Sequence, residues 1–560
     1  MSRRTLSIAA LVFAVGAVWG GLVGIRTMGG RLMAQETPTT GGTDAMEKPA
    51  ETRRIELTKP GVYEDSDCVY LMTKDVTADG NGFTFKGKNV VVDLGGHMLT
   101  FNAAPYRPTF TPKASASHKY YFTPPFGILL DRGAVGIELK NGTIAQGAGA
   151  DKKASCVFVQ ANDANIHHTT TVTAEAGQAH NFFSVWGPTN LELHHNYIVN
   201  RGHAGGGWYG AVSLTMTGAG HDIHHNTIVG GHQGILISAH KGKTGAHVHY
   251  NYIQHRRTRG QKAPQGIYIR ASGCEIDHNE IVTVDGRGLE PTGGDNHWHH
   301  NIVDVRYTSK ARGGFYPENR CYGLWARDQG CNGNRITDNL FVVNNEVVGD
   351  STSNIIGILL CTSPGNPPKL NNVTVTGNRI IGRHDDKVRP AWGVSLTNTG
   401  EGVLIKDNFI WVETAGVVID DRTSGSQVEG NTFVKANDKW EEKVPAYQAN
   451  GSGVKSCVFK ANRIVEPPKD KVPPAATAGL QITRRINGYE LHWKPNGEDD
   501  VLGYYVYRDG KRLEERLKCG RFYVDTTADP KRTYSYAVSA VDLCDNEGPK
   551  CAPVSTASAK

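Results

Sequence analysis

The chain has 560 residues and a formal net charge of +6 when its 22 histidines are counted as neutral. Glycine accounts for 66 residues, which is roughly 12% against a usual value of about 7%, while hydrophobic residues make up 39% and charged residues 21%. This composition excludes a disordered chain, and the positive charge is spread too thinly to indicate a nucleic-acid partner. Abundant glycine with modest hydrophobicity favours many short strands joined by tight turns.

An export signal or a membrane anchor is predicted for residues 1–34. Arg3 and Arg4 precede an apolar run from Leu6 to Ile25, and Ala34 offers a cleavage point. A run of about 20 residues is also long enough to span a bilayer if it is not removed. In both cases we expect a periplasmic, extracellular or cell-surface protein, with membrane contact only through an uncleaved segment. Residues 35–54 are predicted to form a flexible spacer.

Ten cysteines are scattered along the chain. An even number in an exported protein allows disulfides, and the nearest pairs in sequence, Cys321–Cys331 and Cys544–Cys551, are the predicted ones. The alternative is that several cysteines are small buried residues. No CxxC motif occurs, which argues against a zinc knuckle or a haem attachment site.

A degenerate repeat runs through the middle of the chain. Each copy contains an apolar residue, two polar residues, an asparagine, any residue and usually a second apolar residue, as in Leu193-His-His-Asn196-Tyr-Ile198. The asparagines are 22 to 39 residues apart, and the shortest spacing is about one bare coil of a solenoid. They are Asn196, Asn226, Asn251, Asn279, Asn301, Asn339, Asn378, Asn408, Asn431 and Asn462.

Each copy predicts two short strands separated by a sharp turn at the asparagine, a residue that tolerates the left-handed backbone such a turn needs. Stacked coils would align the asparagines as a buried ladder of side-chain hydrogen bonds. A second register, Gly-apolar-x-apolar, begins at Gly234, Gly266, Gly288, Gly323, Gly357, Gly393 and Gly416. The two registers predict an all-β, right-handed parallel β-helix over residues 55–468.

These repeats resemble the parallel β-helix repeats of the pectate-lyase-like superfamily. The stretch Asn89-Val-Val-Val-Asp-Leu-Gly-Gly-His-Met-Leu-Thr100, followed by Asn141-Gly-Thr-Ile144, resembles its opening coils. The resemblance covers about residues 55–468 and implies the fold. The superfamily includes lyases, hydrolases, epimerases and non-enzymatic adhesins, so the resemblance implies no single function.

The pattern changes near the C-terminus. Pro467-Pro468 and Pro473-Pro474 mark a proline-rich linker, assigned to residues 469–477. Residues 478–560, with Leu491-His-Trp493 and Tyr534-Ser-Tyr536, resemble a fibronectin type III domain. The resemblance implies a small seven-stranded β-sandwich that acts as a spacer or attachment module, and we assign it no chemistry.

Histidine pairs recur immediately before the repeated asparagines, as at His194-His195 and His224-His225. We interpret them as stacked turn residues on an outward face of the solenoid. Metal binding is the alternative, but neighbouring residues of a strand point to opposite faces, which argues against a shared ion. The sequence therefore assigns no metal ligands.

The outward positions of the glycine register predict a functional site. Coils stack about 4.8 Å apart, so outward residues of adjacent coils share one patch. An aromatic side chain beside arginines and a carboxylate suits a sugar ring with acidic substituents. The patch contains Tyr268, Arg270, Glu290, Trp325 and Arg327, with Asp285, Arg287, His240 and Lys241 beside it. The alternative is that Arg270, Glu290 and Arg327 form only a cross-coil ion-pair ladder.

The local charge supports an anionic polysaccharide as the partner. From His240 to Arg327 there are 13 Lys and Arg against 8 Asp and Glu, so +5 of the net charge falls there. The insertions at 254–265 and 304–322 are predicted to form groove walls or a lid.

The candidate residues suit a polysaccharide lyase or an epimerase. Both reactions neutralise a uronate carboxylate, through arginine or calcium, and remove the C5 proton. Arg270 and Arg327 are candidates for neutraliser or base, Tyr268 or His240 for the acid, and Trp325 for the sugar platform.

Two other functions stay open. A glycoside hydrolase needs two carboxylates, for which Asp285 and Glu290 are the candidate pair. Signatures of β-helix polygalacturonases, alginate epimerases and calcium-binding pectate lyases are not evident, which favours a non-catalytic glycan-binding or structural surface protein. The cofactor stays unassigned, with calcium the candidate ion.

Overall fold

The computed structural model describes residues 53–559 apart from short internal segments. The segments outside the description are 105–124, 150–152, 176–177, 186, 203–209, 240–244, 257–262, 309–319, 328, 346–353, 363–369, 385–390, 413–414, 436–446, 450–455 and 515–516. The predicted signal or anchor therefore lies outside the described residues, as does almost all of the spacer. No helix in the described ranges is long and apolar enough to cross a membrane.

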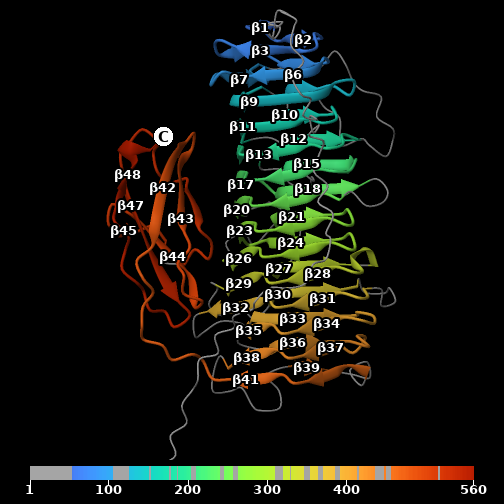
Figure 1. Cartoon of the computed structure of the whole chain (residues 1–560), viewed down its shortest axis with the longest axis vertical. Helices are drawn as coiled ribbons and strands as arrows, with labels where there is room; N and C mark the ends of the chain where they lie inside the picture. The colour runs from blue at the N-terminus through green and yellow to red at the C-terminus, as the bar shows by residue number, and fades with distance from the viewer. Residues whose placement is uncertain are drawn as a thin grey trace, which may run out of the picture. The chain divides into compact units, whose positions relative to one another are not determined.

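Most of the chain forms a parallel β-helix in which each full coil contributes three strands (Figure 1). Strands of successive coils pair in parallel and in register, as Ile235 with Ile267 and Ile267 with Leu289. Connections between parallel strands are right-handed in almost all proteins. The described residues contain no α-helix, and two helical turns lie wholly within them, η1 (Gln329–Cys331) and η3 (Thr556–Ser558). The predicted fold class, an all-β parallel β-helix followed by a small sandwich, is confirmed.

One column of strands carries the glycine register and forms a 14-stranded sheet. Its strands are β2 (Gly61–Tyr63), β5 (Phe83–Phe85), β8 (Phe126–Leu130), β10 (Lys153–Val159), β12 (Gln178–Val185), β15 (Gly210–Thr217), β18 (Gln233–Ala239), β21 (Gln265–Ile269), β24 (Arg287–Pro291), β27 (Arg320–Arg327), β30 (Asn354–Cys361), β33 (Ala391–Thr397), β36 (Ala415–Ile419) and β39 (Tyr447–Ala449).

The other two columns flank the asparagine turn and are joined into a 27-stranded sheet by β9 (Val135–Gln146) and β11 (Asn165–Val172), which belong to both. The strands before the turn are β1 (Arg54–Leu57), β3 (Cys68–Met72), β6 (Lys88–Asp93), β13 (Glu192–His194), β16 (Asp222–His224), β19 (His247–His249), β22 (Glu275–Asp277), β25 (His297–His299), β28 (Arg335–Thr337), β31 (Thr374–Thr376), β34 (Leu404–Lys406), β37 (Gln427–Glu429) and β40 (Val458–Lys460). The strands after it are β4 (Val76–Thr77), β7 (Met98–Phe101), β14 (Tyr197–Asn200), β17 (Thr227–Gly230), β20 (Tyr252–Arg256), β23 (Glu280–Val284), β26 (Ile302–Tyr307), β29 (Leu340–Asn345), β32 (Arg379–His384), β35 (Phe409–Trp411), β38 (Thr432–Val434) and β41 (Arg463–Val465).

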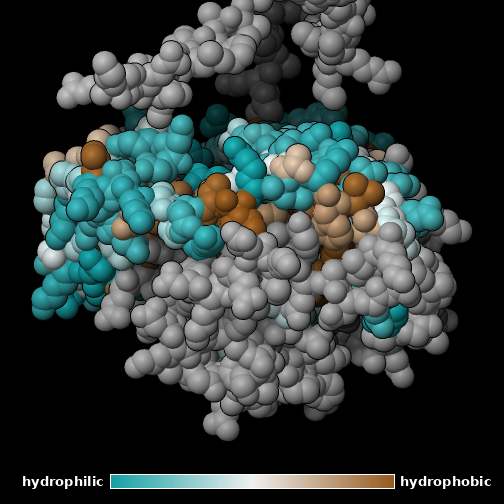
Figure 2. All heavy atoms as spheres, turned by 90° about the horizontal axis from the view of Figure 1, so that it is seen from below, coloured by the Kyte–Doolittle hydropathy of each residue, from teal (hydrophilic) through white to brown (hydrophobic). Residues whose placement is uncertain are grey.

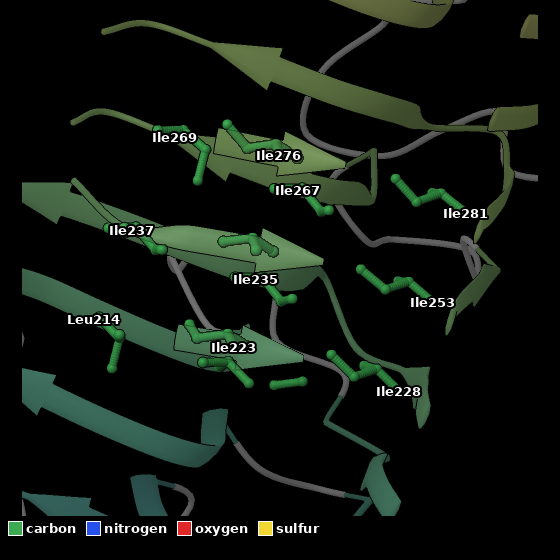
Figure 3. Close-up of a cluster of buried hydrophobic side chains, with 14 of the residues drawn as sticks. Leu214, Ile223, Ile228, Ile235, Ile237, Ile253, Ile267, Ile269, Ile276 and Ile281 are labelled. Carbon is green, nitrogen blue, oxygen red and sulfur yellow. The ribbon is translucent and has the colours of Figure 1, made fainter. Parts of the chain in front are cut away.

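The core is a set of aligned aliphatic columns that run along the solenoid. Figure 3 shows Ile228, Ile253 and Ile281 one above another, and all three are at most 1% exposed. Each coil buries these side chains only against the coils next to it.

Glycines of the second register are required by this close stacking. A Cβ atom on Gly266 would lie 2.5 Å from the carbonyl oxygen of Gly288 in the next coil. Gly234 and Gly323 meet the next glycine carbonyl in the same way. The register therefore marks positions where only a hydrogen atom fits between coils.

The repeated asparagines form one continuous hydrogen-bonded row along the β-helix. Each Nδ2 donates to the Oδ1 of the next coil, as from Asn251 to Asn279 (3.0 Å) and from Asn279 to Asn301 (2.9 Å). The row extends from Asn196 to Asn462, and all its members except the half-buried Asn462 are buried. Thr169 stands at its start, because its Oγ1 donates to Asn196 Oδ1 (2.7 Å).

The left-handed residue of each turn precedes the asparagine. His195, His225, His278 and His300 have φ between 52° and 54°, whereas none of the row asparagines has positive φ. The expectation of a left-handed asparagine is wrong, because its side chain must point inward to join the row. The preceding residue makes the turn instead.

Asn279→Leu is expected to lower the free energy of unfolding by about 1–3 kcal/mol, since it leaves buried amides without partners. Asn251 would lose the acceptor of both its Nδ2 and its backbone N–H, which lie 3.0 and 3.1 Å from Asn279 Oδ1. Denaturant unfolding measures the change. The control is Gln427→Leu, which replaces an exposed amide on β37 and for which we expect less than about 0.5 kcal/mol. Equal stability of both variants would show that the row contributes nothing.

Neither predicted disulfide is formed. Cys321 and Cys331 lie near opposite ends of β27, an extended strand that separates its ends by about 20 Å, well beyond the reach of a disulfide. The Cys331 thiol donates to the carbonyl of Pro291 (3.1 Å). Cys544 Sγ contacts the Pro468 carbonyl at 3.2 Å, while Cys551 is buried in the sandwich core. Most of the ten cysteines are instead small buried residues, which was the alternative interpretation of the sequence.

The C-terminal part forms an antiparallel β-sandwich. One sheet has three strands and the other four, and its core contains the fully buried Trp493 and Tyr536. The three-stranded sheet consists of β42 (Ala478–Arg485), β43 (Gly488–Lys494) and β46 (Phe522–Asp525), and the four-stranded sheet of β44 (Val501–Arg508), β45 (Lys511–Arg512), β47 (Ser535–Asp542) and β48 (Val554–Ser555).

The sandwich packs against the strands that follow the asparagine turn. Two apolar clusters join them, one containing Tyr252 and Val524 and the other Val342 and Leu517. Glu280 on β23 accepts hydrogen bonds from the backbone of Arg521 (2.8 Å) and from its Nε (3.2 Å). Apolar contact and ion pairing therefore both hold the sandwich on the β-helix.

A buried charge cluster reinforces this interface. Arg306 on β26 pairs with Asp304 (2.7 Å) and with Glu514 of the sandwich (3.1 Å), and its Nη2 donates to the Leu517 carbonyl at 2.7 Å. Burial would lower the pKa of Arg306, but Asp304 and Glu514 raise it, so the guanidinium stays charged. Burial and the Arg306 charge lower the pKa of the neighbouring Lys518 to about 8.

The last described coil leaves apolar side chains at the surface. Val458 on β40 is 47% exposed and Ile464 on β41 is 37% exposed. Figure 2, which views the molecule from below, shows hydrophobic surface among the described residues on that side. Among the described residues, the Ile464 side chain is therefore less buried than the matching side chains within the stack.

Candidate functional site

The structure places the predicted patch on three adjacent strands of the 14-stranded sheet. Tyr268 on β21 pairs in register with Glu290 on β24, and Leu289 pairs with Leu324, which sets Trp325 on β27 beside Glu290. Arg327 follows two residues later on β27. The described members of the patch therefore lie on neighbouring coils.

Hydrogen bonds link the patch to a polar ladder. Gln265 Nε2 and Arg287 Nη1 both donate to Glu290 Oε2, the latter at 3.2 Å. Gln233 of the preceding coil donates in turn to Gln265 (2.6 Å). Glu290 is buried, and these bonds hold its carboxylate in one position.

Trp325 carries two guanidinium groups. The Cζ atoms of Arg287 and Arg327 lie 4.0 and 4.5 Å from its ring centroid, a cation–π arrangement. Its Nε1 donates to Cys361 Sγ (3.1 Å), and the ring is 8% exposed. In this arrangement the Trp325 ring contacts the Arg287 and Arg327 guanidinium groups and holds them in position.

Exposure divides the patch into two parts. Tyr268, Glu290 and Trp325 are buried, whereas Arg327 is half-buried and Arg270 is exposed. Burial and the charge of Glu290 raise the pKa of Tyr268, while Arg270 and Arg327 act to lower it. The phenol is therefore protonated at neutral pH. The effect of Arg270 and Arg327 on its pKa also indicates that both guanidinium charges lie near the Tyr268 hydroxyl.

The remaining predicted site residues, Asp285, His240 and Lys241, are not placed in the patch. Asp285 is buried with φ of 57° and accepts hydrogen bonds from Thr308 N (2.6 Å) and Oγ1 (2.7 Å), which fix a turn. His240 and Lys241 lie outside the described residues, together with parts of both predicted wall segments, 254–265 and 304–322.

On the other sheet, three outward columns of side chains follow the strands before the asparagine turn. The first column contains Glu192, Asp222, His247, Glu275 and His297, the second His194, His224, His249, Asp277 and His299, and the third His195, His225, Tyr250, His278 and His300. Rings of the third column stack with centroids 4.8 to 5.1 Å apart.

Neighbouring histidines face the same side of the sheet. His194 Nδ1 lies 2.8 Å from His195 Nδ1, and the same contact recurs between His224 and His225 at 2.9 Å. The expectation that they point to opposite faces is wrong, because the second histidine is left-handed and the strand alternation ends there. The sequence did contain an indication of this arrangement, because the second histidine of each pair stands directly before the turn asparagine, where the strand ends.

Several histidines in these columns have a lowered pKa, which favours their neutral form: His194, His195, His224, His225 and His297. Burial and neighbouring imidazoles lower the pKa of His194 and of His225 to about 4. The hydrogen bond to Asp277 instead raises the pKa of His247. Burial alone would raise the pKa of Asp277, but hydrogen bonds from His247 and His278 lower it to about 2.

A cavity of ≈ 530 Å³ separates the third column from the sandwich. Stacked rings, including Tyr250, line one wall, and Arg485, Arg521 and His492 line the other. Both arginines are paired with carboxylates, Arg485 with Glu490 and Arg521 with Glu280. Sequence reasoning missed this cavity, because it depends on how the sandwich packs.

Comparisons with known proteins give the following. No protein-family model matches the sequence, and no curated protein matches it. The solved structures that resemble it include the tailspike of Escherichia coli bacteriophage HK620 in complex with a pentasaccharide, with 10% identity, 90% of this chain and 79% of that chain covered, and a TM-score of 0.33. A mutant of that tailspike gives 10% identity, 90% and 84% coverage, and a TM-score of 0.34. The Clostridium perfringens spore cortex lytic enzyme SleM gives 13% identity and a TM-score of 0.14, with 25% of this chain and 55% of SleM covered. At these values the fold assignment rests on the strand pairings described above.

Proposed function

We propose that this protein is exported, binds an acidic polysaccharide on the outer face of the 14-stranded sheet, and acts on uronate residues by β-elimination or epimerisation. The proposal depends on three arginines that lie at one patch with a single carboxylate, Glu290. Arg287 pairs with Glu290 and lies with Arg327 over the Trp325 ring, and the charges of Arg270 and Arg327 act on Tyr268. Three guanidinium groups against one carboxylate leave a local positive charge that suits a polyanion.

The exposed Arg270 and the half-buried Arg327 are assigned to the uronate carboxylate. Guanidinium groups bind carboxylates through paired hydrogen bonds, and those bonds strengthen as removal of the C5 proton moves charge onto the carboxylate. The contact with the Trp325 ring holds the Arg327 guanidinium at the patch, where it can pair with a substrate carboxylate.

Tyr268 is assigned as the proton donor to the leaving oxygen. Its raised pKa keeps the phenol protonated at neutral pH, as a general acid requires. With both arginines assigned to the carboxylate, proton abstraction is assigned to one of the two remaining basic candidates, His240 and Lys241, which lie outside the described residues. Calcium stays the candidate ion if a metal assists the arginines.

A second function, glycan binding without catalysis, is favoured by two observations. Glu290 and Asp285 both already accept hydrogen bonds from neighbouring groups, which also argues against a hydrolase that uses this pair. The cavity beside the sandwich is within the usual size range of ligand sites, and it offers stacked rings on one wall.

Incubation with a panel of uronate polymers tests the proposal. An unsaturated product that absorbs at about 235 nm indicates β-elimination. Exchange of the C5 hydrogen with solvent deuterium, without cleavage of the polymer, indicates epimerisation. Calorimetric titration of the same polymers detects binding. Binding without either reaction would establish the non-catalytic function, and neither binding nor reaction would refute both.

A further inference from the structure

Two groups of side chains on the histidine-bearing strands repeat one arrangement of donor atoms. Each combines an acid from one coil with a His-x-His segment from the next. The first group is Asp222 on β16 with His247 and His249 on β19, and the second is Glu275 on β22 with His297 and His299 on β25. Within each group the donor atoms lie within 4.8 Å of one another.

The strand register produces this arrangement twice. Residues two apart on a strand share a face, so both histidines of each segment point outward. Asp222 pairs in register with His247, and Glu275 pairs with His297. The second histidine of each segment reaches back to the acid, with Nε2 to carboxylate distances of 2.9 Å for His249 and 3.0 Å for His299.

We propose that each group binds one zinc ion through two imidazole nitrogens and one carboxylate oxygen. Zinc accepts this donor set in tetrahedral geometry, with water as the fourth ligand and bonds of about 2.0–2.2 Å. The ion takes the place of the proton between Nε2 and the carboxylate. The two rings of each group have centroids 3.9 and 4.1 Å apart, so small rotations about their side-chain bonds bring both nitrogens to one ion.

Solvent reaches both groups. The side chains of Asp222 and Glu275 are 46% and 54% exposed, and that of His247 is 39% exposed. Because the acid and the histidines belong to successive coils, each zinc ion ties two coils together. Zinc is therefore expected to stabilise the β-helix against unfolding.

The two groups differ in one neighbour, which predicts an order of affinity. His247 Nε2 contacts the Asp277 carboxylate (2.6 Å), whereas His297 Nε2 contacts the Thr337 hydroxyl (2.9 Å). The Asp222 group therefore has a second carboxylate beside it. We expect it to bind zinc about tenfold or more tightly than the Glu275 group.

The test measures zinc bound to the full chain, purified without a histidine tag and stripped with a chelator. Equilibrium dialysis against zinc chloride gives the stoichiometry and the affinities. The double variant His247→Ala/His249→Ala should lose one equivalent, the tighter one, and His297→Ala/His299→Ala should lose the weaker one. The quadruple variant should lose both, along with the zinc-dependent rise in unfolding temperature.

The matched control is His167→Gln/His168→Gln, a neighbouring pair on β11 of the same stack that belongs to no three-donor group among the described residues. It should lose no zinc. Circular dichroism without zinc shows whether each variant is folded, and Asp222→Asn, which keeps both rings, should weaken the tighter site at least about tenfold. No zinc bound by the parent protein, or an unchanged stoichiometry in the quadruple variant, would overturn the proposal.

Discussion

Arg270→Ala is expected to lower the rate of uronate-polymer turnover by about 10²–10³-fold, because the lost contacts strengthen as charge develops on the substrate carboxylate. The side chain is exposed, and the backbone N–H of Arg270 keeps its hydrogen bond to the Ile237 carbonyl (2.8 Å). The fold should therefore be unchanged. Initial rates followed by absorbance, with circular dichroism on the same sample, measure both effects.

Two further variants sharpen this result. Arg270→Lys should not restore the rate, since an ammonium group cannot form the paired hydrogen bonds of a guanidinium. Arg335→Ala removes another exposed arginine, from β28 in the other sheet, and should leave the rate within about twofold of the parent. Full activity of Arg270→Ala would show that the reaction takes place elsewhere.

Arg306→Ala is expected to lower the free energy of unfolding by about 3–5 kcal/mol, because it leaves a buried carboxylate without its cation. Asp304 is 1% exposed, and apart from the bonds from Arg306 it accepts a long hydrogen bond from Asn344 Nδ2 (3.4 Å). The loss falls at the sandwich interface, so the sandwich should loosen from the β-helix. Denaturant unfolding gives the energy, and limited proteolysis within residues 466–478 reports the loosening.

The control for this variant replaces the whole pair. Arg306→Met/Asp304→Leu removes both charges and keeps apolar volume, so its stability should lie near that of the parent protein. If the single variant were as stable as the double one, Asp304 would be solvated without Arg306. The interface would then depend on its apolar clusters and on the Glu280–Arg521 pair.

The β-helix was predictable because its contacts are local. Each coil contacts the coils next to it in sequence. The spacing of Asn251, Asn279 and Asn301 is therefore enough to predict that these residues align in one row. The glycine register likewise places Tyr268 beside Glu290, a pairing that the structure contains. In both cases one periodic pattern determines which residues become neighbours.

The burial of the patch and the docking of the sandwich could not be predicted in this way. Glu280 and Arg521 are separated by 241 residues, and no repeat relates them. The two guanidinium groups on Trp325 depend on side-chain conformations that a strand pattern leaves open. The predicted disulfide between Cys321 and Cys331 was wrong because it was based on their closeness in sequence, whereas the extended strand β27 keeps the two residues apart.

The asparagine row also has a direction. Each carboxamide from Asn196 to Asn431 donates to the Oδ1 of the next coil, so the amide dipoles point the same way and add, as peptide dipoles add in an α-helix. The Nδ2 donors face the C-terminal coils, which makes that end of the row the positive pole. The asparagines therefore generate an axial electric field inside an otherwise apolar interior, one that favours anions near the last coil and cations near the first.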